Sequence, residues 1–150
     1  MSTLRRDLRI YLASKTALTA LITGTNGRKH LHLSRIPQGN VSRDAYPAVV
    51  YRRSTGGHEH DLAGAAGYAV PEFEFVVIGE DPDVVEDICE QLRLALQGYR
   101  GLMGGTTIQR CTLDGESDDY IDSKIGDDVG FYMTSLQYTI AYIETVPAFS

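Results

Sequence analysis

Residues 72–98, EFEFVVIGEDPDVVEDICEQLRLALQG, carry the strongest structural signal in this sequence: a strand followed at once by a helix. In the first part, Phe73 and Phe75 alternate with glutamates, as expected of a strand with one buried face. The strand is expected over residues 68–78. Pro71 cannot donate a backbone hydrogen bond, which predicts that the early part lies at an edge of the sheet or just outside it.

The second part has the start and stop signals of a helix. Asp81 suits the N-cap and Pro82 the first helical position, while Gly98 suits the position after the last turn. Acidic residues early in the segment favour the positive end of the helix dipole. Apolar residues recur at helical spacing and predict a buried stripe, formed by Val84, Val85, Ile88, Leu92, Ala95 and Leu96.

Further segments on either side predict regular structure. A helix is expected over residues 3–22, where leucines recur about every four positions and arginines fall between them. Strands are expected over residues 30–33, 48–53, 106–113 and 130–144, the last with tyrosines alternating along it. The order is α-β-β-β-α-β-β. It predicts a single α+β domain over residues 1–150, with a mostly antiparallel sheet and two helices packed on one face.

Charge is unevenly distributed along the chain. The 150 residues have a net charge of -6, but residues 1–60 carry ten Lys/Arg and three Asp/Glu, whereas residues 61–150 carry four and seventeen. This excludes a uniformly basic nucleic-acid binder. No apolar run reaches the roughly 18 residues of a membrane span. The first 15 residues lack the apolar core of a secretory signal, so we expect no membrane partner.

Histidines and cysteines offer only weak candidates for a metal site. The four histidines form two His-x-His pairs, His30/His32 and His58/His60, and residues two apart on a strand point the same way. Each pair could offer two imidazoles to a metal, or could be exposed polar positions; four ligands at zinc spacing are missing. Cys89 and Cys111 are expected to be buried, reduced residues. We therefore predict no metal and no cofactor.

Recognisable catalytic motifs are also missing. The sequence contains no GxSxG elbow, no GxxxxGK[ST] loop, and no GxGxxG after a predicted strand. Residues 104–107, GGTT, precede a predicted strand, so they lack the helix N-terminus that would hold an anion. The sequence therefore predicts a protein that is not an enzyme and has no catalytic residues.

Residues 114–128, DGESDDYIDSKIGDD, contain seven acids and one lysine and predict a solvated loop. The EF-hand pattern fails, because a frame starting at Asp114 has Asp119 at its sixth position and one starting at Asp118 has Tyr120 at its third. We expect the acids to face a basic surface of another subunit, or a channel that DNA must pass without sticking. They are Asp114, Glu116, Asp118, Asp119, Asp122, Asp127 and Asp128.

Residues 56–67, GGHEHDLAGAAG, contain four glycines and predict a long mobile connection at a hairpin tip. We do not expect this segment to pack as an element of its own. Such a segment could be mobile in the free protein and become ordered when a partner binds. The candidates for a partner-ordered loop are Gly56, Gly57, His58, Glu59, His60, Asp61 and Gly64.

Taken in order, these pieces resemble the tail terminator (tail completion) family of long-tailed bacteriophages and gene transfer agents. The resemblance covers most of the chain. It departs from the family at residues 58–60 and in the long stretch between Gly39 and Tyr46. The pieces that carry it are a helix ending near Gly24, Pro37-Gln38-Gly39, Tyr46-Pro47-Ala48-Val49-Val50-Tyr51, Ser54, Asp61-Leu62-x-Gly64, Phe73-x-Phe75 directly before the helix at 83–97, and the tyrosine-rich strand 132–142 behind an acidic segment.

The resemblance implies a structural function. Such proteins form a ring, typically a hexamer, on the head-proximal end of the tail tube; the ring stops tube growth and offers a docking surface to the head. The implied partners are further copies of the chain, the tail tube protein and a head-side connector, with DNA passing through the centre. The implied location is the head–tail junction of a virion assembled in the host cytoplasm. No cofactor or reaction is implied.

A ring needs an interface in which one surface of each subunit meets a different surface of its neighbour. We expect basic groups such as Arg5, Arg9, Arg52 or Arg53 to meet acids of residues 114–128 across the subunit boundary. Each solvated pair contributes little alone.

Three other interpretations stay open at this point. The chain could be another neck component, such as a head-closure protein. It could be a metal-binding module or metal-dependent enzyme using the His-x-His pairs, or a small dimeric regulatory or binding domain. The identity of the partner protein tests the first interpretation, an assay for bound metal tests the second, and the size of the native protein tests the third.

Overall fold

A computed structural model describes residues 4–23, 29–33, 46–56, 58–61, 64–121 and 130–144. At residues 55, 58–61, 64–66 and 121 only the backbone is considered below. In these residues three helices and one sheet follow one another in the order α1 (Leu4–Ala13), α2 (Thr16–Ile22), β1 (Leu31–Leu33), β2 (Ala48–Thr55), β3 (His58–Asp61), β4 (Gly64–Ala69), β5 (Glu72–Gly79), α3 (Pro82–Leu96), β6 (Gly101–Met103), β7 (Thr106–Ile121) and β8 (Phe131–Ile143).

The sheet is built around β8. On one side β8 pairs with β5 and, further along, with β4; on the other side it pairs with β7. Beyond β5 lie β2 and then β1, so β1 and β7 form opposite edges of the central sheet. All pairs are antiparallel except β1 with β2. The predicted α+β class with a mostly antiparallel sheet is therefore confirmed.

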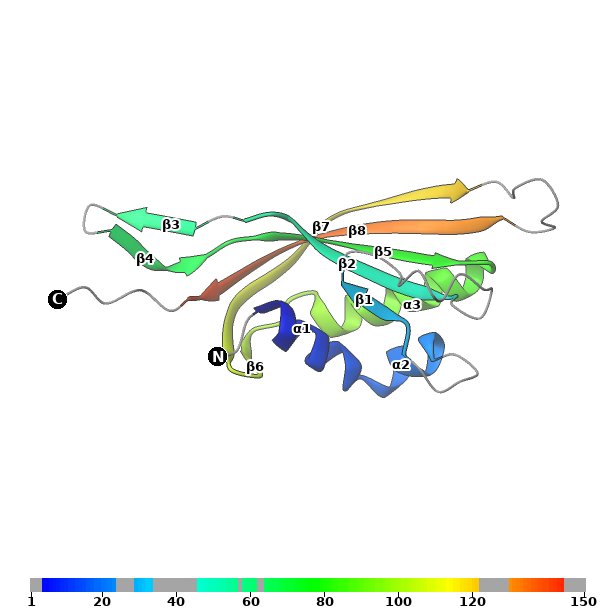
Figure 1. Cartoon of the computed structure of the whole chain (residues 1–150), viewed down its shortest axis with the longest axis horizontal. Helices are drawn as coiled ribbons and strands as arrows, with labels where there is room; N and C mark the ends of the chain where they lie inside the picture. Colours follow the sequence, from blue (N-terminus) through cyan, green and yellow to red (C-terminus); the bar gives the residue numbers. More distant parts are fainter. Residues whose placement is uncertain are drawn as a thin grey trace.

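The molecule is elongated, with the helices on one face of the sheet (Figure 1). The β3–β4 hairpin extends beyond the helices in one direction, and at the other end of the molecule the paired ends of β7 and β8 lie over the start of α3 (Figure 1). No helix among the described residues is long and apolar enough to cross a membrane. Of the two hairpins, β3–β4 is the one that lies away from the helices (Figure 1).

The core lies between the helices and the facing side of the sheet. Tyr51 of β2, Phe75 of β5 and Tyr138 of β8 are almost fully buried there. The Tyr51 and Phe75 rings stack at 5.8 Å between centroids, and the Phe75 and Tyr138 rings meet edge to face at 5.5 Å. Burying three aromatic rings from neighbouring strands against one another stabilises the register of the sheet. Leucines from all three helices close this core from the other side.

The helix expected over residues 3–22 is two helices. Lys15 has an extended backbone (φ -84°, ψ 103°), and the Ser14 hydroxyl donates to the carbonyl oxygen of Tyr11 at 2.5 Å. A serine that hydrogen-bonds to its own helix competes with the next turn of that helix. The break lets Leu12 and Leu18 both be fully buried.

The helix expected after β5 is confirmed together with its caps. The Asp81 side chain accepts a hydrogen bond from the Asp83 backbone N–H at 2.9 Å, and Pro82 opens the helix. Gly98 has φ +77°, the left-handed conformation expected after the last turn.

Three sequence predictions about the strands are wrong. The strand expected over residues 68–78 is two strands, β4 and β5, with Val70 and Pro71 between them outside the ladder as one alternative expected; the edge position is wrong for β4, which pairs with both β3 and β8. Residues 56–67 were expected not to pack as an element, but residues 58–61 form β3 and residues 64–67 form the first part of β4 through pairing with each other. Residues 114–121 were expected in a loop but continue β7, because β8 supplies backbone partners as far as Phe131.

Candidate functional site

The acidic segment lies on the end of β7 that pairs with the start of β8. Asp114, Glu116, Asp118 and Asp119 are all exposed on this strand, whereas Asp122, Asp127 and Asp128 fall outside the described residues. Strand alternation separates the four acids. Glu116 and Asp118 lie opposite Leu136 and Thr134 on the side that faces the helices; Asp119 lies opposite Met133 on the other side.

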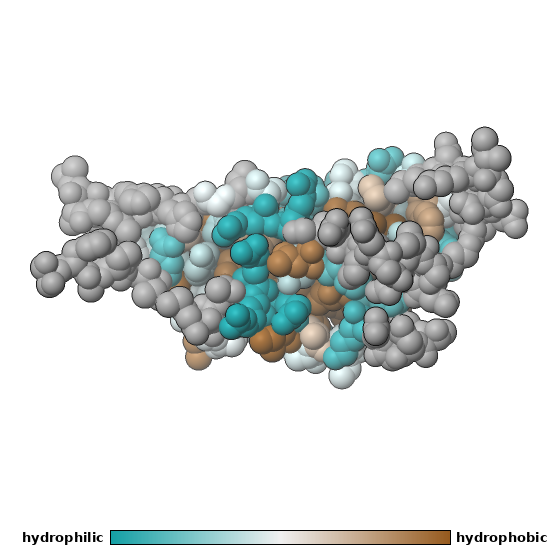
Figure 2. Space-filling model, viewed as in Figure 1, coloured by the Kyte–Doolittle hydropathy of each residue, from teal (hydrophilic) through white to brown (hydrophobic). Residues whose placement is uncertain are grey.

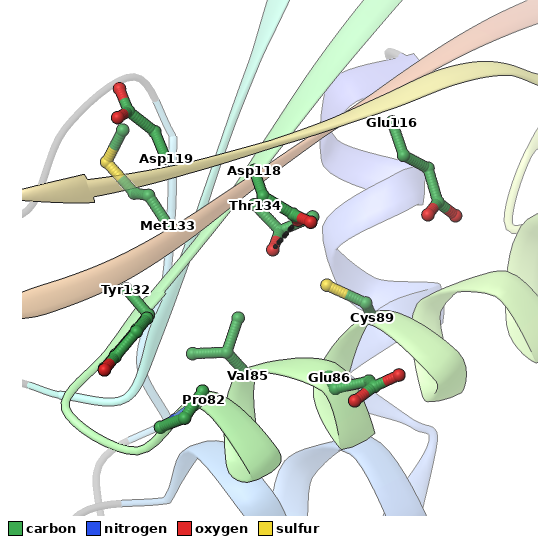
Figure 3. Close-up of a pocket in the computed structure, with 10 residues that line it drawn as sticks. All are labelled: Pro82, Val85, Glu86, Cys89, Glu116, Asp118, Asp119, Tyr132, Met133 and Thr134. Carbon is green, nitrogen blue, oxygen red and sulfur yellow. Dashed lines mark hydrogen bonds between the residues drawn. The ribbon is translucent and has the colours of Figure 1, made fainter.

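A groove of about 310 Å³ separates the start of α3 from the β7–β8 hairpin. Pro82, Val85 and Cys89 of α3 form its apolar floor (Figure 3). The side chains of Glu116, Asp118, Thr134 and Tyr132 point from the hairpin toward α3, and Glu86 adds a third carboxylate on the helix (Figure 3). Asp119 and Met133 point to the other side of the hairpin, so they border the groove without lining its floor (Figure 3).

Electrostatics in the groove are dominated by negative charge. Asp118 accepts a hydrogen bond from the Thr134 hydroxyl at 2.9 Å, which fixes its orientation. Burial is the main cause that raises the pKa of the Cys89 thiol to about 11. A hydrogen bond with Thr134 lowers this pKa, and the nearby carboxylates raise it further; they are Glu116, Asp118 and Glu86. Three carboxylates around one half-buried thiol favour a cationic ligand.

The basic residues expected at an interface are divided among three places. Arg5 and Arg9 are exposed on α1, and Arg53 is exposed on β2. Arg52 is also exposed, but its Nε lies 3.2 Å from Glu74 Oε1 of the neighbouring strand, so it has an ionic partner within the chain. A band of hydrophilic residues crosses the middle of the molecule, over the first half of α1 and the adjoining sheet (Figure 2). Arg52 and Arg53 point to opposite faces of β2, because neighbouring strand residues alternate, so the four arginines do not share one face of the sheet.

A second surface lies at the β1 edge and was not predicted from the sequence. It is a shallow depression of about 530 Å³ lined by Arg9, Ile10, Ala13, Ser14, Lys29 and Leu31. The Lys29 ammonium donates to the Ala13 carbonyl oxygen at 3.2 Å and so lies at the end of α1. Ile10 is 54% exposed, which is unusual for an isoleucine on a helix that packs on the core. The surface combines exposed apolar groups with positive charge.

The glycine-rich segment forms the β3–β4 hairpin, so the expectation of a hairpin tip was right. Its strands contain His58, Glu59, His60, Asp61 and Gly64; Gly56 is exposed and lies outside the strands, and Gly57 falls outside the described residues. Among the described residues, Tyr68 and Ala69 of β4 pair with β8 and the Gly67 carbonyl oxygen accepts a hydrogen bond from the Glu144 N–H, so most of this hairpin is a two-stranded ribbon there.

His30 and His32 lie on the same side of the chain, as alternation predicted. Their rings stack at 6.2 Å between centroids. His30 is buried with Nδ1 3.3 Å from the Pro47 carbonyl oxygen, and His32 Nε2 is buried without a hydrogen-bond partner among the described residues. Burial, and to a lesser degree His30, lowers the pKa of His32. Within the part of the chain that the structure describes, no group of three His, Cys, Asp or Glu side chains could hold a metal.

Comparison with known proteins adds a likeness in fold. No family model matches this sequence, and no curated protein matches it. A solved chain described as part of the virion of a native gene transfer agent particle has the same fold, with a TM-score of 0.69 at 14% sequence identity. The match covers 93% of this chain and 94% of that chain, so the likeness extends over nearly the whole length of both.

Proposed function

We propose that this chain is a structural virion protein that forms a ring, in our view a hexamer, on the head-proximal end of a phage or gene-transfer-agent tail tube. The observation that carries the proposal is the likeness in fold, over nearly the whole length of both chains, to a chain from a gene transfer agent virion. The resemblance of the sequence pieces to tail terminator proteins points in the same direction.

In this role the ring stops polymerisation of the tail tube and offers a docking surface to the filled head. Its partners are other copies of the chain, the tail tube protein and a head-side connector. Its place is the head–tail junction, and its action requires no cofactor and no catalysis. The elongated subunit with a hairpin at each end supports this role, because one hairpin can contact the tube while the other contacts the head-side ring.

The acids of β7 suit either of two positions in such a ring. If they line the lumen, carboxylates repel phosphates and DNA slides past without sticking. If they lie between subunits, they attract arginines of the neighbour. Reversing the charge of Asp118 and Asp119 together tests whether these acids lie between subunits or are simply exposed to solvent. Unchanged ring assembly with unchanged salt dependence contradicts a position between subunits.

The decisive experiment is electron microscopy of particles made without this protein. A tail terminator predicts overlong tails that carry no head, because nothing stops tube growth. Expression of the chain from a plasmid is the control and restores tails of uniform length joined to heads. Tails of normal length that fail to join heads contradict the terminator role and assign the chain to head closure.

A further inference from the structure

We propose that the groove between α3 and the β7–β8 hairpin receives the α1 surface of a second copy of this chain, with Ile10 on the apolar floor and Arg9 against the acidic rim. The ring that repeated contacts of this kind would close rests on the proposed function. The contact depends only on two complementary surfaces of the chain.

The groove selects for an unusual ligand. Its floor is apolar, through Pro82 and Val85, so it favours an aliphatic side chain. Its rim carries the carboxylates of Glu86, Glu116 and Asp118; Arg93 lies within electrostatic range of Glu116 but forms its ion pair with Glu90. Tyr132, 38% exposed and in ring contact with Tyr120, provides an aromatic wall of the kind enriched in protein interfaces. A partner needs an apolar centre next to positive charge.

The β1 edge of the same chain presents that combination. Ile10 and Ala13 lie one helical turn apart on α1, with Arg9 beside them and Lys29 at the end of the helix. Leu33 of β1, 43% exposed, extends the apolar area along the edge. The α1 surface, defined as Arg9, Ile10, Ala13, Lys29, Leu31 and Leu33, therefore matches the groove in charge and in polarity.

The two surfaces lie on opposite edges of the central sheet, the α1 surface beside β1 and the groove beside β7. A chain with complementary surfaces on opposite sides forms heterologous contacts, which close into a ring when the rotation between subunits allows it. A symmetric dimer is disfavoured, because it would have to form the groove–α1 contact twice between the same two copies, and surfaces on opposite edges of one sheet do not both face a single partner. Charge complementarity within one chain is the reason to choose a second copy as the occupant.

Site-specific photo-crosslinking of the purified full chain tests the contact. Ile10 is replaced by p-benzoylphenylalanine, and crosslinked products are mapped by mass spectrometry over a range of protein concentrations. We expect crosslinks between two copies that join position 10 to residues 82–89, 116–118 or 132–134. The matched control carries the same probe at Leu94, which is 63% exposed on α3 outside the groove. It should give no crosslink into the groove.

Charge reversal tests the electrostatic part. Arg9→Glu and Glu116→Arg should each lower the crosslink yield from position 10 by about tenfold or more, since like charges facing each other across an interface are strongly disfavoured. Combining both changes in one chain should restore most of the yield. Arg52→Glu is the control, because Arg52 is paired within the chain, and should leave the yield within about twofold.

The outcomes separate this inference from the proposed function. Crosslinks that map elsewhere, no crosslinks between copies, or failure of the double reversal to restore the yield overturn the groove contact. Crosslinking to a different virion protein in assembling cells also overturns it and assigns the α1 surface to that protein. In each case, overlong headless tails in the absence of the chain would still support the terminator role.

Discussion

Asp7 on α1 lies directly against Gly104 in the turn between β6 and β7. A Cβ atom at position 104 would meet Asp7 Oδ1 at 2.5 Å and Asp7 Cγ at 2.8 Å. Asp7 is only 3% exposed and accepts a hydrogen bond from the Thr106 hydroxyl. This contact ties the first helix to a strand turn nearly one hundred residues away.

Gly104→Ala should therefore destabilise the protein by two effects. Gly104 has φ +59°, so an alanine there carries the left-handed backbone penalty of roughly 1–2 kcal/mol. The clash with Asp7 adds roughly 1–3 kcal/mol, as in other overpacked sites. Gly98→Ala is the matched control, since Gly98 has φ +77° and a Cβ there would meet nothing within 4 Å, and it should lose only the backbone part. Equal losses in urea unfolding of the two variants would exclude the Asp7 clash.

How far the sequence predicts the fold depends on whether the signal is local. The alternation at Phe73 and Phe75 and the cap at Asp81 are local patterns, and the predicted strand and helix match the structure there. The strand at residues 114–121 has the composition of a loop and forms because β8 lies alongside it. No proline or glycine in the sequence marks the break in the first helix at Lys15. The break depends on how the two halves pack against the sheet, and a local sequence pattern does not show that packing.

The candidate site was predictable only in part for the same reason. The acids of β7 are recognisable from composition, but their assignment to two faces depends on a register that the sequence does not show. Glu86 and Tyr132 join Glu116 and Asp118 only when α3 packs beneath the hairpin. In the sequence, Ile10 is one more residue of an amphipathic helix. Its exposure becomes a signal only when the structure shows which side of α1 faces the core.

The two thiols should react slowly in the native protein. Burial raises the pKa of Cys89 to about 11 and that of Cys111 to about 12, so the reactive thiolate is scarce at neutral pH. In a time course with iodoacetamide, Cys89 should be alkylated before Cys111, because Cys111 is almost fully buried. Glu116→Gln should accelerate reaction at Cys89, because it removes a charge that raises the thiol pKa. Rapid labelling of both residues without denaturant would contradict this account.

Stability should fall as the pH drops below about 6.5, and His32 should contribute to the fall. Its pKa is lowered from the ordinary value of 6.5 mainly by burial, so folding favours the neutral imidazole. The unfolded chain then binds a proton at a higher pH than the folded chain does, and acid favours unfolding. His32→Leu removes this dependence and the unpartnered Nε2. The free energy of unfolding, measured between pH 7 and pH 5, should decline less in the variant than in the wild type. Parallel declines would show that His32 binds protons equally in the folded and unfolded chains, which would contradict a lowered pKa in the native protein.

The β3–β4 hairpin should exchange its amide protons faster than the sheet to which it is attached. A two-stranded hairpin is marginally stable by itself, and in the described part of the chain this one is attached through Tyr68 and Ala69, which pair with β8, and through the Gly67 carbonyl, which accepts from Glu144. Residues of β5, paired on both sides by β2 and β8, provide the internal control within the same protein. In assembled particles a partner lying on the hairpin should slow exchange at residues 58–61 and 64–67 relative to the free chain. Equal protection of the hairpin in the free and assembled protein would show that it contacts neither the tail tube nor the head-side ring.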